Sequence, residues 1–233
     1  MKKLSFILFI IFISFFASAQ KDIVLHYQEI DNKEIHFGFT LGFNVMDFSV
    51  DPSNETWRND TLMPELNNLA PGFHVAIISN IRLNDNFDFR FLPGISLGQR
   101  NLLFYKGGVL ISEMKIESTF IDIPFQLKYK ADRINNFRPY LIGGFNLRND
   151  MARNKDFNED EDIYIKLKPF DVYYELGFGI DFYLPYFKFS TELKYSVGTL
   201  DVLSHVPHET EAQFVNSIDK LNSSLFMISF HFE

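Results

Sequence analysis

The sequence of 233 residues contains no cysteine, and this absence excludes several classes of protein. Without cysteine the chain has no disulfide bond, no thiolate metal site and no lipid-anchored N-terminal cysteine. Basic residues are also in deficit, since 22 Lys and Arg stand against 30 Asp and Glu, which gives a net charge of −8. Nucleic-acid binding requires a basic stripe, so we expect no nucleic-acid partner.

Long apolar runs and catalytic motifs are scarce as well. Past Gln20 there is no stretch of 18 apolar residues, so no transmembrane helix is expected there. No P-loop, dinucleotide fingerprint, metal-binding helix motif or Ser-His-Asp order appears. We therefore expect neither a catalytic residue, nor a cofactor, nor a metal, and predict that the protein is not an enzyme.

Two loop segments contain residues that could form an active site or a metal site. Ser204, His205, His208 and Glu209 lie close together in the sequence and could form a hydrolase or metal cluster, but proximity within a polar loop is weak support. The acidic run from Asp156 to Asp162 lacks the glycine and the spacing of a calcium loop, so a solvated loop is the favoured interpretation.

The first residues read as a secretory signal peptide. Two lysines precede an apolar core in Met1–Ala19, which ends in Ala-Ser-Ala, so cleavage is expected between Ala19 and Gln20. A transmembrane anchor is the alternative, and the apolar core is short for one. Residues 20–35 are polar without a clear period and are predicted to form a periplasmic N-terminal linker.

Aromatic residues are abundant, at 17% of the chain with 28 Phe, although the mean hydropathy is only −0.05. Strict alternation of apolar and polar residues reconciles the two values, because the two kinds of residue average out in the mean hydropathy. The clearest case is the segment from Phe170 to Val197, where every second residue is apolar and Pro185-Tyr186 interrupts the pattern. Period two over this length predicts two long β-strands joined by a tight turn.

The same pattern recurs along the chain, and each arm reaches the roughly 9–11 residues that a transmembrane strand needs. The predicted strands are His36–Phe48, Gly72–Leu83, Phe87–Gln99, Glu117–Lys130, Phe137–Arg148, Phe170–Leu184, Phe187–Val197 and Ser223–Glu233. Pro93 lies inside the third strand and predicts a local bulge. The fold class is therefore all-β, an eight-stranded antiparallel transmembrane β-barrel of the outer-membrane type, spanning residues 36–233.

Side-chain size decides which face points inward. The interior of eight strands is just wide enough for side chains, and it cannot hold the large apolar set, which includes most of the Phe residues. The opposite face carries glycines and charges of both signs, which can pair across the lumen. The predicted luminal structural charge network is Arg82, Asp88, Arg90, Asp122, Lys128, Arg138, Arg148, Asp171, Glu175, Asp181, Glu192 and Lys194.

The connections alternate between short and long. Short turns are expected at Asn84–Asn86, Ala131–Asn136 and Pro185–Tyr186, and the other connections are long. Outer-membrane barrels have short periplasmic turns and long outer loops. The pattern predicts a multi-pass barrel in the cell outer membrane, in contact with its lipids, with both termini periplasmic.

Six segments together resemble the PorT family, called SprT in gliding bacteria. They are His36–Phe48, Phe89–Gly98, Glu117–Lys130, Asn136–Leu147, Tyr173–Ser196 and Ile218–Glu233. The phrase IDIPFQLKYK alone would indicate only the wider outer-membrane barrel superfamily; the order of all six points to PorT. The resemblance implies a non-enzymatic component of the type IX secretion system, needed for export of cargo with a C-terminal sorting domain and acting with other components of that system.

Two alternatives remain open from the residues alone. One is a small outer-membrane enzyme acting through the loop at Ser204–Glu209. The other is a narrow porin or adhesin of the generic barrel superfamily.

Overall fold

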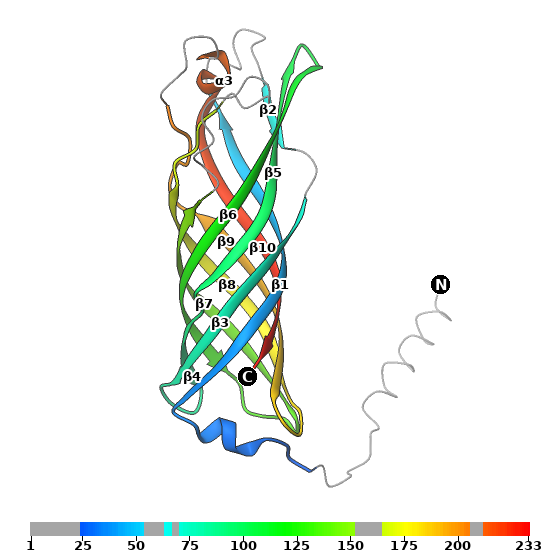
Figure 1. Ribbon diagram of the computed structural model, residues 1–233, viewed down its shortest axis with the longest axis vertical. Helices are drawn as coiled ribbons and strands as arrows, with labels where there is room; N and C mark the ends of the chain where they lie inside the picture. Colours follow the sequence, from blue (N-terminus) through cyan, green and yellow to red (C-terminus); the bar gives the residue numbers. More distant parts are fainter. Residues whose placement is uncertain (1–23, 54–62, 67–69, 152–164, 206–211) are drawn as a thin grey trace, which may run out of the picture.

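A computed structural model describes residues 24–53, 63–66, 70–151, 165–205 and 212–233. The molecule is a tall β-barrel with a short helical segment under one end and folded loops over the other (Figure 1). Its elements are η1 (Gln28–Asn32), β1 (Ile35–Pro52), β2 (Met63–Leu66), β3 (Pro71–Arg82), β4 (Phe87–Phe91), β5 (Gly94–Lys106), β6 (Val109–Lys130), β7 (Phe137–Asp150), β8 (Phe170–Tyr183), β9 (Lys188–Gly198), α3 (Ala212–Asn216) and β10 (Ile218–Phe232).

The wall is closed and entirely antiparallel. Neighbouring strands pair in chain order, and β1 closes the sheet by pairing with β3 along one edge and with β10 along the other. Strands β4 and β5 occupy one wall position in succession, and β2 adds to β5 beyond the wall. Eight strand positions therefore close the barrel, which confirms the predicted fold class. Among the described residues, no helix has the length and apolar character needed to cross a bilayer.

The third predicted strand is interrupted at Pro93, but the predicted bulge is absent, because the pairing register with β3 is the same on both sides of the interruption. Strand β4 ends at Phe91, and β5 begins at Gly94. Proline has no N–H to give to the ladder, but its carbonyl still accepts the Ile77 N–H at 3.0 Å. The wall therefore keeps its connection to β3 across the interruption.

Several strands are longer than predicted, mainly at the long-loop end. The segment expected to be a hairpin extension is indeed a hairpin, in which β5 and β6 continue to a turn at Gly107-Gly108. Both glycines have positive φ, 58° and 79°, which the turn requires. The three short connections lie together at the opposite end, as predicted.

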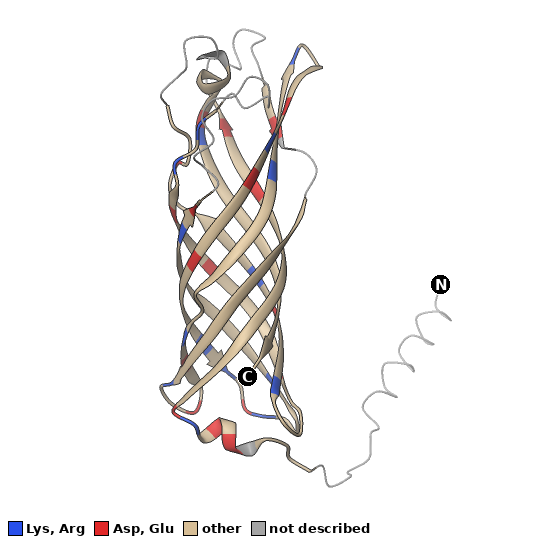
Figure 2. Ribbon diagram, in the orientation of Figure 1, with Lys and Arg blue, Asp and Glu red and all other residues tan. Residues whose placement is uncertain are grey.

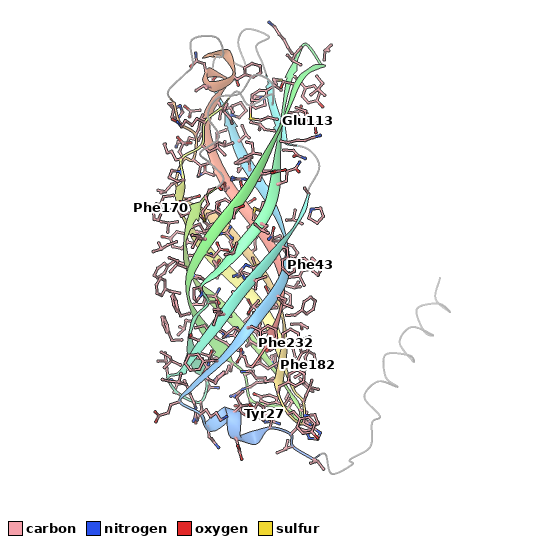
Figure 3. All side chains as sticks on the ribbon, in the orientation of Figure 1. Tyr27, Phe43, Glu113, Phe170, Phe182 and Phe232 are labelled. Atoms are coloured by element: carbon pink, nitrogen blue, oxygen red, sulfur yellow. The ribbon has the colours of Figure 1, made fainter. Side chains whose placement is uncertain are left out.

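Large apolar side chains cover the outside of the wall. Phe43 and Phe170 project outward (Figure 3), with 59% and 45% of their surface exposed. Aromatic rings gather outside near the short-turn end, where Phe39 stacks on Phe232 with centroids 4.9 Å apart. The outward apolar face, which would be costly in water, suits contact with lipid.

The long-loop end has a hydrophobic core of its own, here called the apolar cap. It joins residues from upper strands, loops and α3, and Phe104 packs edge-on against Phe214 at 4.8 Å. Its buried members are Phe48, Leu102, Phe104, Met114, Ile165, Val202, Leu203, Phe214, Val215, Ile218 and Leu221. The described parts of the long loops are thus folded onto the barrel.

Candidate functional site

The interior of the barrel is filled by a column of polar and charged side chains. They stand at inward positions because side chains alternate between the two faces of a strand. Charged residues occur along the strands and at both ends (Figure 2), and eleven of the twelve predicted luminal residues are at least 92% buried. The exception, Arg82, is described below.

Arg90 on β4 is the centre of the lower part of this column. Its guanidinium donates to Glu233 Oε1 at 2.6 Å, to Glu192 Oε2 at 3.2 Å and to Asn80 Oδ1 at 3.2 Å. Glu233 also forms an ion pair with Lys188, at 2.5 Å. One buried cation thus joins acids from two strands on the far side of the barrel.

A second group lies next to the first. Lys128 Nζ contacts both carboxylate oxygens of Asp181, at 2.8 and 2.7 Å, and sits 3.7 Å from the ring centroid of Tyr140. The Tyr140 hydroxyl donates to Glu192 Oε2 at 2.9 Å. This tyrosine therefore connects the Lys128 pair to the Arg90 group.

The upper part is centred on two acids. Asp122 pairs with Arg148 and accepts the Ser96 hydroxyl. Glu175 accepts hydrogen bonds from the Gln126 amide at 2.6 Å and from the Lys194 ammonium group at 3.2 Å. Each of the two acids has an opposite charge and at least one further hydrogen bond, the condition under which buried ions are tolerated.

Three of the predicted network residues do not join an ion pair inside the barrel: Arg82, Asp171 and Arg138, the last of which belongs to the short-turn cluster described below. Arg82 lies at the rim, where it pairs with Asp85 of the adjacent turn, and its side chain is 28% exposed. The prediction that Arg82 belongs to the luminal network is therefore wrong. In the alternation along β3 it occupies an inward position, but it is the last residue of the strand and so lies at the rim. Asp171 is buried and accepts the backbone N–H groups of Val172 and Leu200, at 2.7 and 3.0 Å.

Several network members were missed in the sequence. Arg100 donates to Ser118 at 2.6 Å and Asp150 at 3.0 Å inside the barrel, although the predicted strand ended at Gln99. Its parity continues that of Ser96, so the signal was present and only the strand end was misplaced. The other missed polar members inside the barrel are His36, His74, Lys130, Asp150, Lys188, His231 and Glu233.

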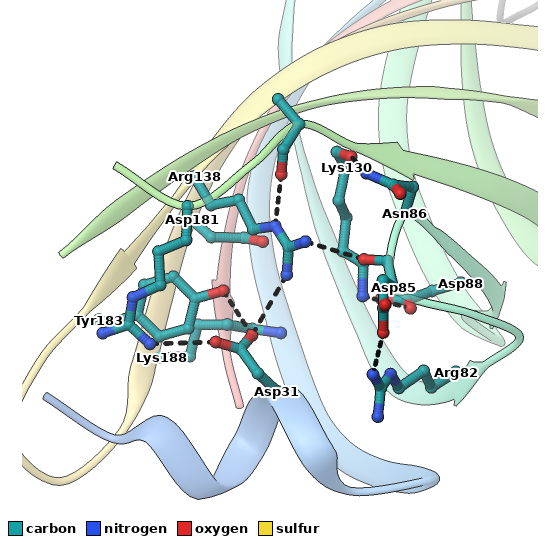
Figure 4. A network of polar contacts seen from close by, with 12 residues as sticks. Asp31, Arg82, Asp85, Asn86, Asp88, Lys130, Arg138, Asp181, Tyr183 and Lys188 are labelled. Carbon is teal, nitrogen blue, oxygen red and sulfur yellow. Dashed lines mark hydrogen bonds and ion pairs between the residues drawn. The ribbon is translucent and has the colours of Figure 1, made fainter. Parts of the chain in front are cut away.

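A separate polar cluster closes the short-turn end (Figure 4). Asp31 of η1 accepts a hydrogen bond from the Tyr183 hydroxyl at 2.8 Å. It also forms ion pairs with Arg133 at 3.0 Å and with Arg138 at 3.4 Å. The predicted luminal residue Arg138 belongs here, and it also donates to the carbonyl of Asp85 at 2.8 Å. Residues 24–34, predicted to be a linker, are thus tied across the mouth of the barrel.

The loop residues considered as a possible hydrolase or metal cluster do not come together as such a site in the described part of the chain. His205 pairs with Asp201 at 2.9 Å and is half exposed. Burial opposes ionisation of Asp201, but backbone N–H donors from Leu221 and Leu203 outweigh it and lower the pKa of this carboxyl. His208, Glu209, the acidic run and the expected cleavage site at Ala19-Gln20 lie outside the described residues. Within those residues no three His, Asp or Glu side chains are grouped as a metal would need.

Glycine makes room for the large side chains of the column, and this can be tested. A Cβ at Gly179 would overlap the ring of Tyr140, whereas a Cβ at Gly143 would lie 3.4 Å from a Leu176 methyl, an ordinary contact. We expect Gly179→Ala to lower the free energy of unfolding by about 1–3 kcal/mol through overpacking. Gly143→Ala should leave it within about 0.5 kcal/mol. Denaturant titration of the folded protein, followed by circular dichroism, measures both; equal effects would contradict the packing described.

Comparison with known proteins gives one family match. A family model described as an outer membrane protein beta-barrel domain matches residues 18–203. No curated protein matches the chain.

Solved structures with similar coordinates include three barrels. OprG from Pseudomonas aeruginosa is 14% identical with a TM-score of 0.47, over 91% of this chain and 97% of that one. Neisserial surface protein A (NspA) is 13% identical with a TM-score of 0.45, over 85% and 98%. Ail, the attachment invasion locus protein of Yersinia pestis, solved with the heparin analogue sucrose octasulfate, is 12% identical with a TM-score of 0.42, over 86% and 99%.

Proposed function

The chain belongs to the outer membrane protein beta-barrel domain family, and we propose that it is a non-enzymatic component of the type IX protein secretion system. It is needed for export of cargo carrying a C-terminal sorting domain, and it acts through protein partners in that system. Its short turns and both termini face the periplasm, and its long loops face outward.

The observation that carries this proposal is the filled interior. Buried pairs such as Lys128–Asp181 and Arg90–Glu233 are 0–1% exposed and cross the lumen. A barrel closed in this way is not the channel through which folded cargo passes. Its remaining surfaces are the lipid-facing wall and the two ends, so a role in secretion is exerted by binding at those surfaces.

The secretion system itself is proposed from the six segments that resemble the PorT family. All six form wall strands with inward polar residues in the column; the first and last contribute His36 and His231. The resemblance therefore includes the residues that close the lumen as well as the outward face. A closed barrel agrees with a family in which cargo translocation is attributed to a much larger barrel.

A clean deletion tests the secretion role. We expect sorting-domain cargo to disappear from the medium and its precursors to accumulate in the periplasm, with other outer-membrane proteins unchanged. Fractionation and analysis of the secreted proteins give the result. Normal cargo export in the deletion strain would remove the secretion assignment and leave the barrel itself standing.

Electrical recording tests the closed lumen independently. In planar bilayers the purified protein should give no conductance steps above the background of empty membranes, because paired charges and the Tyr140 ring occupy the lumen. A channel-forming porin in the same bilayers serves as the positive control. Reproducible steps from this protein would favour a narrow porin.

A cell-surface adhesin is the second candidate, and the apolar cap is the observation that favours it. The cap fixes the described outer loops in place, which gives the exposed end a defined shape for recognition. Loss of binding to host or matrix surfaces in the deletion strain, with cargo export intact, would favour the adhesin.

A further inference from the structure

The cluster at the short-turn end gathers three donors from three elements around one carboxylate. Arg133 comes from the turn after β6, Arg138 from β7 and Tyr183 from the end of β8; together they are called the cradle. They reach Asp31 at 3.0, 3.4 and 2.8 Å, and the Arg133 guanidinium lies 3.6 Å from the Tyr183 ring centroid. Two cations and a hydroxyl in one place recognise an acidic side chain.

A peptide backbone is recognised beside the cradle. The Asn136 side chain donates to the carbonyl of Val24 at 2.9 Å and accepts the N–H of His26 at 2.9 Å. Arg133 donates to the carbonyl of His26 at 2.6 Å. Since these bonds are made to main-chain atoms, they do not depend on side-chain identity. Any extended strand with an acid a few residues further on could make them.

The chain's own segment fills this site with few other attachments. Val24 and Leu25 are 73% and 46% exposed, and Ile30 is the one large apolar side chain of η1 that is buried. Tyr27 has φ of 46°, a left-handed conformation unfavourable for a residue with a Cβ, and no side chain caps η1. The Asp31 side chain is 27% exposed, so the carboxylate can be reached from outside. Residues 24–31 are therefore attached to the barrel mainly through the cradle and Asn136.

We propose that the cradle and Asn136 form a peptide-binding site for an acidic segment of a periplasmic partner protein, occupied by residues 24–31 until that segment displaces them. The proposal rests on the proposed function for the periplasmic location of this end and for the use of protein partners. It adds the chemistry of the partner: an extended stretch of backbone followed by an aspartate or glutamate.

A peptide competition experiment tests the site in the full mature chain folded in detergent micelles. The probe is a fluorescent synthetic peptide with the sequence of residues 24–35, and binding is followed by anisotropy. A tethered competitor acts at an effective concentration in the millimolar range, so the wild-type protein should bind the probe weakly. Asp31→Asn weakens the tethered occupant and should raise probe affinity about tenfold or more.

Matched variants separate this mechanism from general loosening. Asp85→Asn removes a carboxylate that is 84% exposed at the same rim and outside the cradle, and should leave probe affinity at the wild-type value. Adding Arg133→Gln or Asn136→Ala to Asp31→Asn should cancel the gain. A probe with Asn in place of its aspartate should bind Asp31→Asn about tenfold more weakly than the Asp probe binds the same variant. Heat-modifiable migration on gels verifies that each variant is folded.

Three results would overturn the proposal: no gain on Asp31→Asn, equal binding of the Asp and Asn probes, or displacement of the probe by inorganic phosphate at concentrations similar to those of unlabelled peptide. The last would reduce the cradle to a simple anion site. The experiment does not depend on secretion. Loss of export on deletion with failed peptide exchange rejects only this inference, whereas successful exchange with normal export rejects only the secretion role.

Discussion

Replacing Arg90 with methionine should lower the free energy of unfolding by about 3–5 kcal/mol, the range for breaking a buried ion pair by removing one partner. The substitution leaves Glu192 and Glu233 inside the barrel without their shared cation. Methionine approximates the length of the lost side chain, so the effect comes mainly from lost charge compensation; Glu233 keeps Lys188, whereas Glu192 keeps no Lys or Arg partner among the described residues. Guanidinium unfolding from lipid vesicles, followed by circular dichroism, measures the change.

Arg82→Met is the matched control for this experiment. Arg82 pairs with an aspartate that is 84% exposed, and exposed pairs contribute at most about 1 kcal/mol. The two substitutions are chemically identical and differ only in burial and partners. If both variants unfolded at the same denaturant concentration, the assignment of Arg90 to the interior and of Arg82 to the rim would be contradicted.

Leu141→Arg should impair membrane insertion, at a cost of about 2–4 kcal/mol for a charge on the lipid face near the midplane. Leu141 lies on the outside of β7 opposite Phe178 of β8, and 57% of its surface is exposed. An arginine there has no acidic partner on the surrounding apolar face. The expected result is a smaller heat-modifiable fraction in outer-membrane preparations.

Leu110→Arg is the matched control for Leu141→Arg. It introduces the same charge at a position of similar exposure that faces water, whereas Leu141 faces lipid. Leu110 is 47% exposed and lies beside the turn of the β5–β6 hairpin, beyond the wall. Its folded fraction should match the wild type. Equal loss of folded protein for both variants would mean that exposure, and not contact with lipid, decides the outcome.

Alternation predicted the faces of the strands well, because parity alone determines whether a side chain points in or out. Parity says nothing about height along the strand. Parity therefore assigns Arg82 to the column although it lies at the rim, and a predicted strand that ends at Gln99 assigns Arg100 to a loop although its side chain is inside the barrel. Strand ends depend on hairpin pairing above the wall, as between β5 and β6, and the local pattern does not encode it.

The peptide-binding site escaped sequence analysis for a different reason. Asp31 and Arg133 are remote in sequence, and nothing in the polar segment before β1 has a period. Their contact depends on the barrel being closed, since the turn after β6 and the end of β8 must already lie side by side. Such a site can be recognised only after the wall has been assembled.

The pairing of β1 with β10 has a consequence for how the barrel forms. Every other seam of the wall joins strands that follow one another in the chain, whereas this one brings Phe39 opposite Phe232. Closing so large a loop carries the greatest entropic cost of any seam, so this pairing is expected to form last and to limit the folding rate. Until then, β1 and β10 each present an open apolar edge that can pair with another nascent chain. The step that completes the wall is therefore also the step that ends the chain's exposure to aggregation.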